Sequence, residues 1–184
     1  MKANMPTRKT APDVYLEPIS PFRQEEFLRL ARASRAFHRK WVAPPSTPKT
    51  FAAYMARIGD DSFRCFYLCR KEDGALLGVI NISQIVHRLF QSAYLGYYVF
   101  APYARQGYLT AGLSLAMAKA FGELRLHRLE ANLQSENAPS RKLAKRLGFR
   151  KEGYSPRYLK IAGKWTDHER WAITVEDWRA ARRR

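Results

Sequence analysis

The 184 residues suffice for one domain with a hydrophobic core, and the 46% share of hydrophobic residues excludes a wholly disordered chain. Charge is the outlier: 33 Lys and Arg residues against 16 Asp and Glu residues give a net charge of +17, which predicts attraction to polyanions. No apolar run approaches the roughly 18 residues of a membrane span, and no signal-peptide core follows the polar start. We therefore expect a soluble, cytoplasmic protein without membrane contact.

Helix start signals occur twice in the first third of the chain. Ser20-Pro21 and Thr47-Pro48 each place a capping residue before a proline at the first helical position, whereas Pro44 and Pro45 exclude a helix between them. A basic, flexible arm is predicted at 1–12 and a strand over 14–19, followed by the two helices, of which the second ends at Gly59. The next two strands, over 63–70 and 76–86, are joined by a turn at Glu72-Asp73-Gly74, and a further strand covers 94–100.

The second half alternates helices and strands. An apolar stripe with helical spacing begins after Gly107, and Asn137 is a capping residue for another helix, which Gly148 ends. Strands are predicted over 127–133, 149–154 and 165–174. The fold class is therefore α/β with a mixed sheet, in a single domain at 13–178 that is followed by a basic tail at 179–184.

The cysteines and histidines do not predict a metal site. Cys65 and Cys69 lie four apart in a predicted strand, and four strand residues span about 13 Å, too far for a disulfide. Zinc needs four ligands, and the 4 histidines lack a suitable spacing. We expect two free thiols in the core and no metal.

The segment 94–121 predicts a strand, a turn and a helix in direct succession. Free backbone N–H groups at the helix start, with Gly107 permitting close approach and Arg105 beside it, would suit a diphosphate. The same pattern also fits a plain connection with no ligand. A phosphate-binding P-loop is excluded, because Leu113 stands where its lysine is required.

This segment, the run Asn137-x-x-Ser140 and the later Leu147-Gly148-Phe149 resemble the GCN5-related N-acetyltransferases. More narrowly, the strand Tyr94-Leu95-Gly96-Tyr97 and the segment 159–168 are similar to the Rim-type ribosomal-protein alanine acetyltransferases. The resemblance covers residues 14–178. It implies a mostly antiparallel central sheet that is split at the cofactor site and flanked by about four helices.

The resemblance also implies acetyl-CoA as co-substrate, lying between the strands at 94–100 and 127–133. Ser140 matches the position proposed to protonate the leaving thiolate, although a serine in a first helical turn can also simply bind backbone. The residues implied to bind the cofactor are Tyr97, Tyr98, Val99, Arg105, Gln106, Gly107, Tyr108, Leu109, Thr110 and Asn137. Those implied to bind the acceptor are Trp41, Tyr158 and Trp165, each of which could instead be a core aromatic.

Several positions depart from the family pattern. They are Ala104 and Leu109 in the turn, Ala144 where many members have a tyrosine general acid, and Tyr94 where many have a strand glutamate. No convincing general base is apparent, and Asp167 and His168 are guesses. A weak base favours an α-amine, whose pKa is about 8, over a lysine amine at about 10.4.

We therefore expect direct transfer of an acetyl group to the N-terminal alanine of a ribosomal protein. Basic clusters at 2–9, 29–40, 141–150 and 179–184 predict contact with ribosomal RNA, unless they serve solubility alone. One alternative is the same fold acting on another amine, such as a small molecule or an aminoacyl-tRNA. Another is a non-catalytic basic module that binds RNA or the ribosome.

Overall fold

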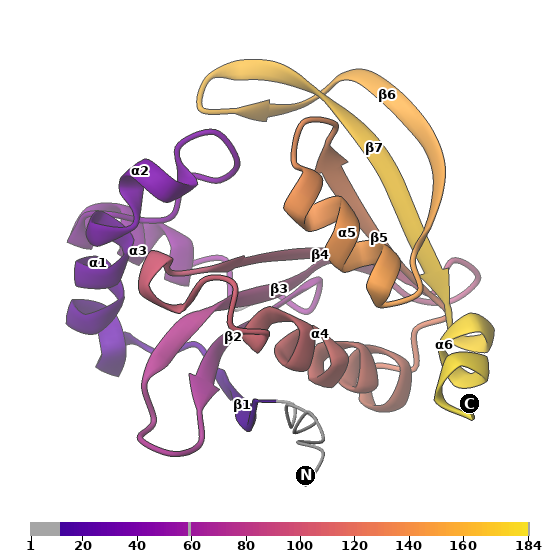
Figure 1. Cartoon of the computed structure of the whole chain (residues 1–184), viewed down its shortest axis with the longest axis horizontal. Helices are drawn as coiled ribbons and strands as arrows, with labels where there is room; N and C mark the ends of the chain where they lie inside the picture. The colour runs from indigo at the N-terminus through magenta and orange to yellow at the C-terminus, as the bar shows by residue number, and fades with distance from the viewer. Residues whose placement is uncertain (1–11, 59, 184) are drawn as a thin grey trace, which may run out of the picture.

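The computed structural model describes residues 12–58 and 60–183, so Gly59 and most of the predicted basic arm lie outside the described residues. In the described part, a seven-stranded sheet has the order β1-β2-β3-β4-β5-β7-β6 (Figure 1). Neighbouring strands are antiparallel except β4 and β5, which are parallel. The predicted α/β class is confirmed. The strands are β1 (Val14–Pro18), β2 (Phe63–Arg70), β3 (Leu76–Val86), β4 (Ser92–Val99), β5 (Arg128–Gln134), β6 (Arg150–Ile161) and β7 (Lys164–Thr174).

Six α-helices, more than predicted, flank this sheet in the described residues. Two hydrophobic layers form because adjacent strand residues face opposite sides: Ile80 packs with α4 and α5, and Val79 packs with α1 and α3. The helices are α1 (Gln24–Ala33), α2 (Arg35–His38), α3 (Pro48–Met55), α4 (Tyr108–Ala118), α5 (Ala138–Arg146) and α6 (Val175–Arg182).

Two of the three predicted capping residues begin helices through side-chain hydrogen bonds. Ser20, the third, precedes only a 3-10 turn at Pro21–Arg23 and makes no such bond, and α1 begins after Arg23. The Thr47 hydroxyl accepts a hydrogen bond from the backbone N–H of Thr50 at 3.2 Å, and the Thr50 hydroxyl binds back to the Thr47 N–H at 3.1 Å. The Asn137 side chain accepts the backbone N–H of Ser140 at 3.2 Å. Both cysteines are buried and free, as predicted.

The last hairpin is longer than predicted. β6 continues past Tyr154 to Ile161, because it pairs with β7 as far as Lys164. Ala162 and Gly163 connect the strands with φ values of 47° and 85°, which suit a two-residue hairpin turn. Pro156 hides this strand in the sequence, but β6 is an edge strand and tolerates a proline.

The last helix, α6, continues through Arg182, past the expected domain end at 178. The Thr174 hydroxyl caps this helix by accepting the backbone N–H of Asp177 at 3.4 Å. Trp178 anchors the helix, with its ring centroid 5.3 Å from that of Phe121. The helix was not predicted from the sequence, because basic residues make up most of the segment 179–184. No helix of the described residues has the length and apolar character to cross a membrane.

Candidate active site

β4 and β5 stop pairing part-way along their length. Their parallel register covers only 92–94 and 128–130, although β4 continues to Val99 and β5 to Gln134. Figure 1 shows β5 and β7 leading away from the end of β4 that lies toward α1 and α2. We call the point where the two strands separate the split. It leaves backbone N–H and C=O groups of both strands without a strand partner.

The edge of β4 at the split presents the peptide groups of Tyr97 and Val99. In an antiparallel ladder, alternate residues bind the neighbouring strand, and the Phe100 N–H donates to the Leu77 carbonyl at 2.8 Å. Phe100 and Tyr98 therefore face β3, while Tyr97 and Val99 face the split. The Val99 carbonyl accepts a hydrogen bond from His38 Nε2 at 2.8 Å.

The turn between β4 and α4 exposes a row of backbone donors. Arg105 and Gly107 have φ values of 62° and 84°, and α4 begins directly afterwards at Tyr108. Within the described part of the chain, the N–H groups of 105–110 have no hydrogen-bond acceptor. Such N–H groups at a helix start bind anions. Leu109, which departs from the family pattern, has not displaced the helix start from Gly107.

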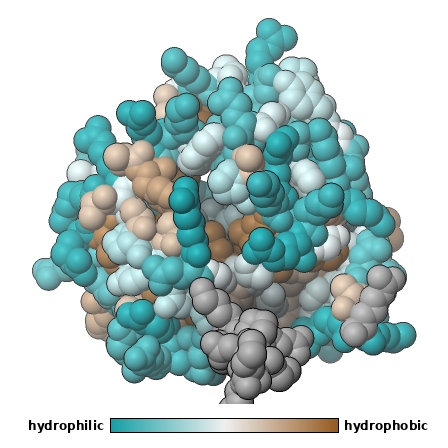
Figure 2. Space-filling model, in the orientation of Figure 1, coloured by the Kyte–Doolittle hydropathy of each residue, from teal (hydrophilic) through white to brown (hydrophobic). Residues whose placement is uncertain are grey.

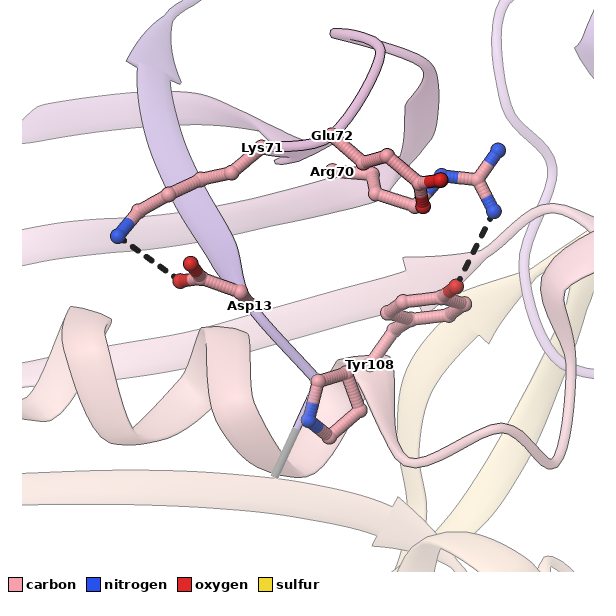
Figure 3. Close-up of a pocket in the computed structure, with 6 residues that line it drawn as sticks. Asp13, Arg70, Lys71, Glu72 and Tyr108 are labelled. Carbon is pink, nitrogen blue, oxygen red and sulfur yellow. Dashed lines mark hydrogen bonds and ion pairs between the residues drawn. The ribbon is translucent and has the colours of Figure 1, made fainter. Parts of the chain in front are cut away.

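A separate cavity of about 480 Å³ lies beside this helix start, toward β1 and the β2–β3 hairpin (Figure 3). Arg70 donates to the Tyr108 hydroxyl at 3.2 Å, and Lys71 pairs with Asp13 at 2.8 Å. These charged groups therefore have partners within the protein. The cavity does not include the edge of β4, so the split is the better candidate for chemistry.

Several buried polar atoms without a partner belong to elements that border the split. In the described residues, the side-chain atoms of this kind are His38 Nδ1, Tyr97 Oη, Tyr98 Oη, Asn132 Oδ1, Ser135 Oγ and Arg141 Nε. The Tyr98 hydroxyl lies in the core near Cys65 and Tyr67, whereas the others belong to β4, to β5 and the loop after it, to α2 and to the start of α5. Since folded proteins rarely leave buried polar atoms unpaired, these atoms are candidates to bind a polar ligand.

Ser140 lies in the first turn of α5, beside the Tyr97 side chain. Burial raises the pKa of Tyr97 to about 12, and the neighbouring Ser140 hydroxyl opposes that rise. Two hydroxyl groups that can hold a proton are therefore adjacent at the split. The sequence predicts a role for the backbone of Tyr97 alone, because no local pattern indicates that its side chain lies beside Ser140.

Three carboxylates beside the split are already paired. On the α1–α3 face, Glu130 lies 2.8 Å from Arg128, which also pairs with Glu152. Glu169 lies on the α5 face, where it pairs with Lys151 at 2.8 Å and with Arg141 at 3.2 Å. Tyr94, opposite Glu130 in the register, has its pKa raised to about 12, mainly by the neighbouring Tyr158 hydroxyl. None of these groups is a free base.

The two guesses for a general base are also engaged. Asp167 accepts hydrogen bonds from the Tyr154 hydroxyl and from the Arg157 N–H, and these lower the pKa of Asp167. The geometry therefore disfavours Asp167. His168 is buried, and its Nδ1 lies 2.8 Å from the Thr166 carbonyl, a contact that orients the ring with Nδ1 protonated and leaves the lone pair on Nε2.

The three aromatic residues expected near the acceptor occupy different places. The Trp41 carbonyl accepts a hydrogen bond from Gln134 Nε2 at 3.2 Å, at the end of β5. Tyr158 lies against His168, which pairs with Gln134 in the β5–β7 register. Trp165, by contrast, stands near the tip of the β6–β7 hairpin and is 62% exposed. The structure places Trp41 and Tyr158 beside the same end of β5.

A family model described as an acetyltransferase (GNAT) domain matches residues 14–150. The chain belongs to this family. It is therefore an acyltransferase, an N-acetyltransferase that takes its acetyl group from acetyl-CoA. The sheet with its split and flanking helices is the GNAT fold.

Relatives of this GNAT differ in the amines that their names state. The uS5-alanine N-acetyltransferase of Escherichia coli is 36% identical over 117 residues, which are 64% of this chain and 60% of that relative. Mycobacterium smegmatis RimJ, solved in complex with CoA-disulfide, has a TM-score of 0.79 at 30% identity, covering 89% of this chain and 83% of that one. A Vibrio cholerae spermidine N-acetyltransferase, solved with CoA and spermine, has a TM-score of 0.76 at 19% identity over 90% and 98% of the chains. That last likeness shows the fold alone.

The residues around the split suit CoA, a ligand with a diphosphate and two amides. The edge of β4 offers peptide groups at Tyr97 and Val99, and the turn offers the donors of 105–110. Asn137 caps α5 close to Ser140. Tyr98 differs from the other predicted residues, because its backbone faces β3 and its buried ring packs against α1 and α3.

Proposed function

We propose that this GNAT transfers acetyl groups directly to N-terminal α-amines, with the alanine terminus of a ribosomal protein as acceptor. The observation that carries the proposal is the pairing of the acidic groups beside the split. Glu130 and Glu152 pair with Arg128, and Glu169, on the α5 face, pairs with Lys151. An acceptor that must be deprotonated by a strong base, or held by free carboxylates, is poorly served there.

The pKa of the acceptor amine decides between the classes of substrate. An α-amine with a pKa of about 8 is roughly one-tenth neutral at pH 7, a handicap of about 1.4 kcal/mol. A lysine-like amine at about 10.4 faces about 4.6 kcal/mol. A polyamine carries further positive charges as well, and these would meet carboxylates already paired with Arg128. The α-amine is the acceptor that needs the least help from the protein in losing its proton.

Acetyl-CoA supplies the acetyl group as a thioester, and the chain's own residues bind and polarise it. We propose that the backbone of Tyr97 and Val99, the N–H groups of 105–110 and the Asn137 side chain bind this co-substrate. A backbone N–H at Val99 would stabilise the developing oxyanion, typically by about 3 kcal/mol. The Ser140 hydroxyl would hold the proton for the leaving thiolate, with the Tyr97 hydroxyl beside it. Because a thiol has a pKa near 8.5, a weak acid suffices.

The acceptor would enter on the face where Trp41 and Tyr158 flank the end of β5. Trp165, exposed on the hairpin, would contact residues further along an acceptor chain. The relationship to the Escherichia coli uS5-alanine N-acetyltransferase supports a ribosomal protein as that chain. The net charge of +17 supports docking on ribosomal RNA beside it.

The test is incubation of the protein and acetyl-CoA with a mixture of ribosomal proteins, followed by intact mass spectrometry. We expect one ribosomal protein to gain a single acetyl group at its N-terminus. A peptide with that N-terminal sequence should be acetylated, whereas the same peptide with a blocked α-amine and an internal lysine should not. Spermidine provides the opposing arm: faster acetylation of spermidine than of any peptide would contradict the proposal.

A further inference from the structure

Two buried polar side chains connect the first helices to the end of β4. Ser34 and His38 lie one helical turn apart, where α1 meets α2, and the His38 N–H donates to the Ser34 carbonyl at 2.9 Å. Their exposed fractions are 0% and 3%. Residues with this spacing lie on the same side of a helix, and here that side faces the strand.

Each side chain binds one backbone group at the exit of β4. The Ser34 hydroxyl accepts the Ala101 N–H at 2.9 Å, and His38 Nε2 lies 2.8 Å from the Val99 carbonyl. The Phe100 N–H between them is held by the Leu77 carbonyl at 2.8 Å. The backbone that leads from β4 into the turn is thus fixed from both sides.

The tautomer of His38 follows from these contacts. A carbonyl oxygen only accepts hydrogen bonds, so Nε2 carries the proton and Nδ1 bears a lone pair. Nδ1 is buried without a partner in the described residues, and burial lowers the pKa of His38. The imidazole is therefore neutral at pH 7, and a neutral group can remain buried between aromatic rings, including that of Tyr98 at 5.2 Å.

The same segment reaches β5 on the other side of the split. The Trp41 N–H donates to the His38 carbonyl at 2.7 Å, and the Trp41 carbonyl accepts from Gln134 Nε2 at 3.2 Å. Residues 38–41 thus contact both strands beyond the point where they separate. Figure 1 shows α2 and the loop after it near the end of β4 from which β5 and β7 lead away.

We propose that Ser34 and His38 are positioning residues that orient the exit of β4 and, through it, the donor row at 105–110. This inference rests on the proposed acetyl-CoA site in the split. We call the two contacts of Ser34 and His38 with the backbone of Ala101 and Val99 the clamp. The short turn Ala101–Tyr103 and residues 104–107 connect these held peptide groups to the start of α4. A change in the clamp therefore alters the direction of the donors, and the segment that borders the acceptor side is coupled to the affinity for the acetyl donor.

The test measures the dissociation constant of CoA itself by titration calorimetry, using the full chain and three variants. His38→Leu removes the donor to Val99, whereas His38→Gln keeps an N–H near the position of Nε2. Ser34→Ala removes the acceptor for Ala101. We expect His38→Leu to bind CoA about tenfold more weakly and Ser34→Ala severalfold more weakly, since lost hydrogen bonds to a diphosphate have effects of this order. His38→Gln should remain within about twofold of the unmodified protein.

Tyr67→Phe is the matched control, because it also removes a hydrogen bond from a fully buried side chain. The Tyr67 hydroxyl donates to the Ser20 carbonyl at 2.9 Å, away from the exit of β4. This variant should lose thermal stability and keep its CoA affinity. A folded His38→Leu protein that binds CoA as tightly as Tyr67→Phe does would overturn the clamp, and Ser34→Ala decides by the same criterion if His38→Leu does not fold.

The outcome also separates this inference from the proposed acceptor. If the unmodified protein binds CoA but acetylates no α-amine, the acceptor proposal fails while the clamp is still decided by the variants. If the unmodified protein binds no CoA, the donor site in the split is wrong and the clamp falls with it.

Discussion

At the scale of single residues, the structure separates two roles that the sequence left combined in Ser140. The cap of α5 uses the backbone N–H of Ser140, which the Asn137 side chain accepts at 3.2 Å. The Ser140 hydroxyl is not needed for that contact and lies beside the Tyr97 hydroxyl. Replacing the side chain therefore tests the chemistry without removing the cap.

We predict that Ser140→Ala lowers kcat by about 100-fold or more, the lower range for loss of general acid catalysis. The dissociation constant of CoA and the melting temperature should change little, because the backbone N–H and the Asn137 cap remain. Steady-state kinetics with the identified peptide and calorimetry with CoA measure both. Ser114→Ala, which removes an exposed hydroxyl bound to the Thr110 carbonyl of α4, is the control; equal kcat values in both variants would remove Ser140 from the mechanism.

At the scale of elements, the start of α4 depends on the left-handed backbone of Gly107, with φ of 84°. An L-residue costs about 1–2 kcal/mol in this region, and a β-branched side chain is worse than asparagine. A Cβ at Gly107 would lie 3.4 Å from Cγ of Pro12, so space alone does not forbid a side chain. The conformation of the backbone is the stricter requirement.

We expect Gly107→Val to weaken CoA binding at least tenfold, because relaxing this φ turns the adjoining N–H groups away from the diphosphate. Gly107→Asn, whose side chain tolerates the left-handed region, should retain more of the affinity. Circular dichroism establishes that each variant is folded, and calorimetry gives the dissociation constants. Unchanged CoA affinity in a folded Gly107→Val protein would mean that the diphosphate site lies elsewhere.

At the scale of the whole molecule, the basic residues of α5 do not all serve the same purpose. Arg141 pairs with the buried Glu169 at 3.2 Å, whereas Lys142, Lys145 and Arg146 are exposed. Figure 2 shows hydrophilic residues over much of this face, around hydrophobic ones near its middle. The exposed cations are therefore available to a polyanion, whereas Arg141 is already paired.

If this surface docks on ribosomal RNA, association with ribosomal subunits should weaken linearly in a plot of log affinity against log salt. Each phosphate neutralised contributes a slope of about −0.9, or about −0.7 for single strands. Changing Lys142, Lys145 and Arg146 to glutamine should make the slope shallower by about 2 to 3. The control changes three exposed lysines elsewhere, Lys49, Lys160 and Lys164. Binding that is insensitive to salt, or slopes that are equal in the two variants, would argue against α5 as the RNA contact.

Local signals in the sequence accounted for most of the elements. Pro48 after Thr47, the capping residue Asn137 and the flexible Gly107 act within a few residues of themselves, so their effects can be predicted without knowing the fold. The strands over 63–70 and 76–86 have the predicted ends, because each alternates or is continuously apolar over its length. The continuation of β6 past Tyr154, which contains Pro156, and the helix ending at Arg182 were missed, since their stability comes from partners distant in the sequence.

The sequence by itself determined the class of fold, the family resemblance and the turn that could receive a diphosphate, because these depend on local spacing and residue type. Only the tertiary structure decided which polar groups are paired and which are left without partners. The pairing of Glu152 with Arg128 and of Glu169 with Arg141, the proximity of Ser140 to Tyr97 and the reach of His38 to Val99 join segments that lie far apart in the chain. Such contacts are set by strand register and helix packing, and no local pattern in the sequence encodes them.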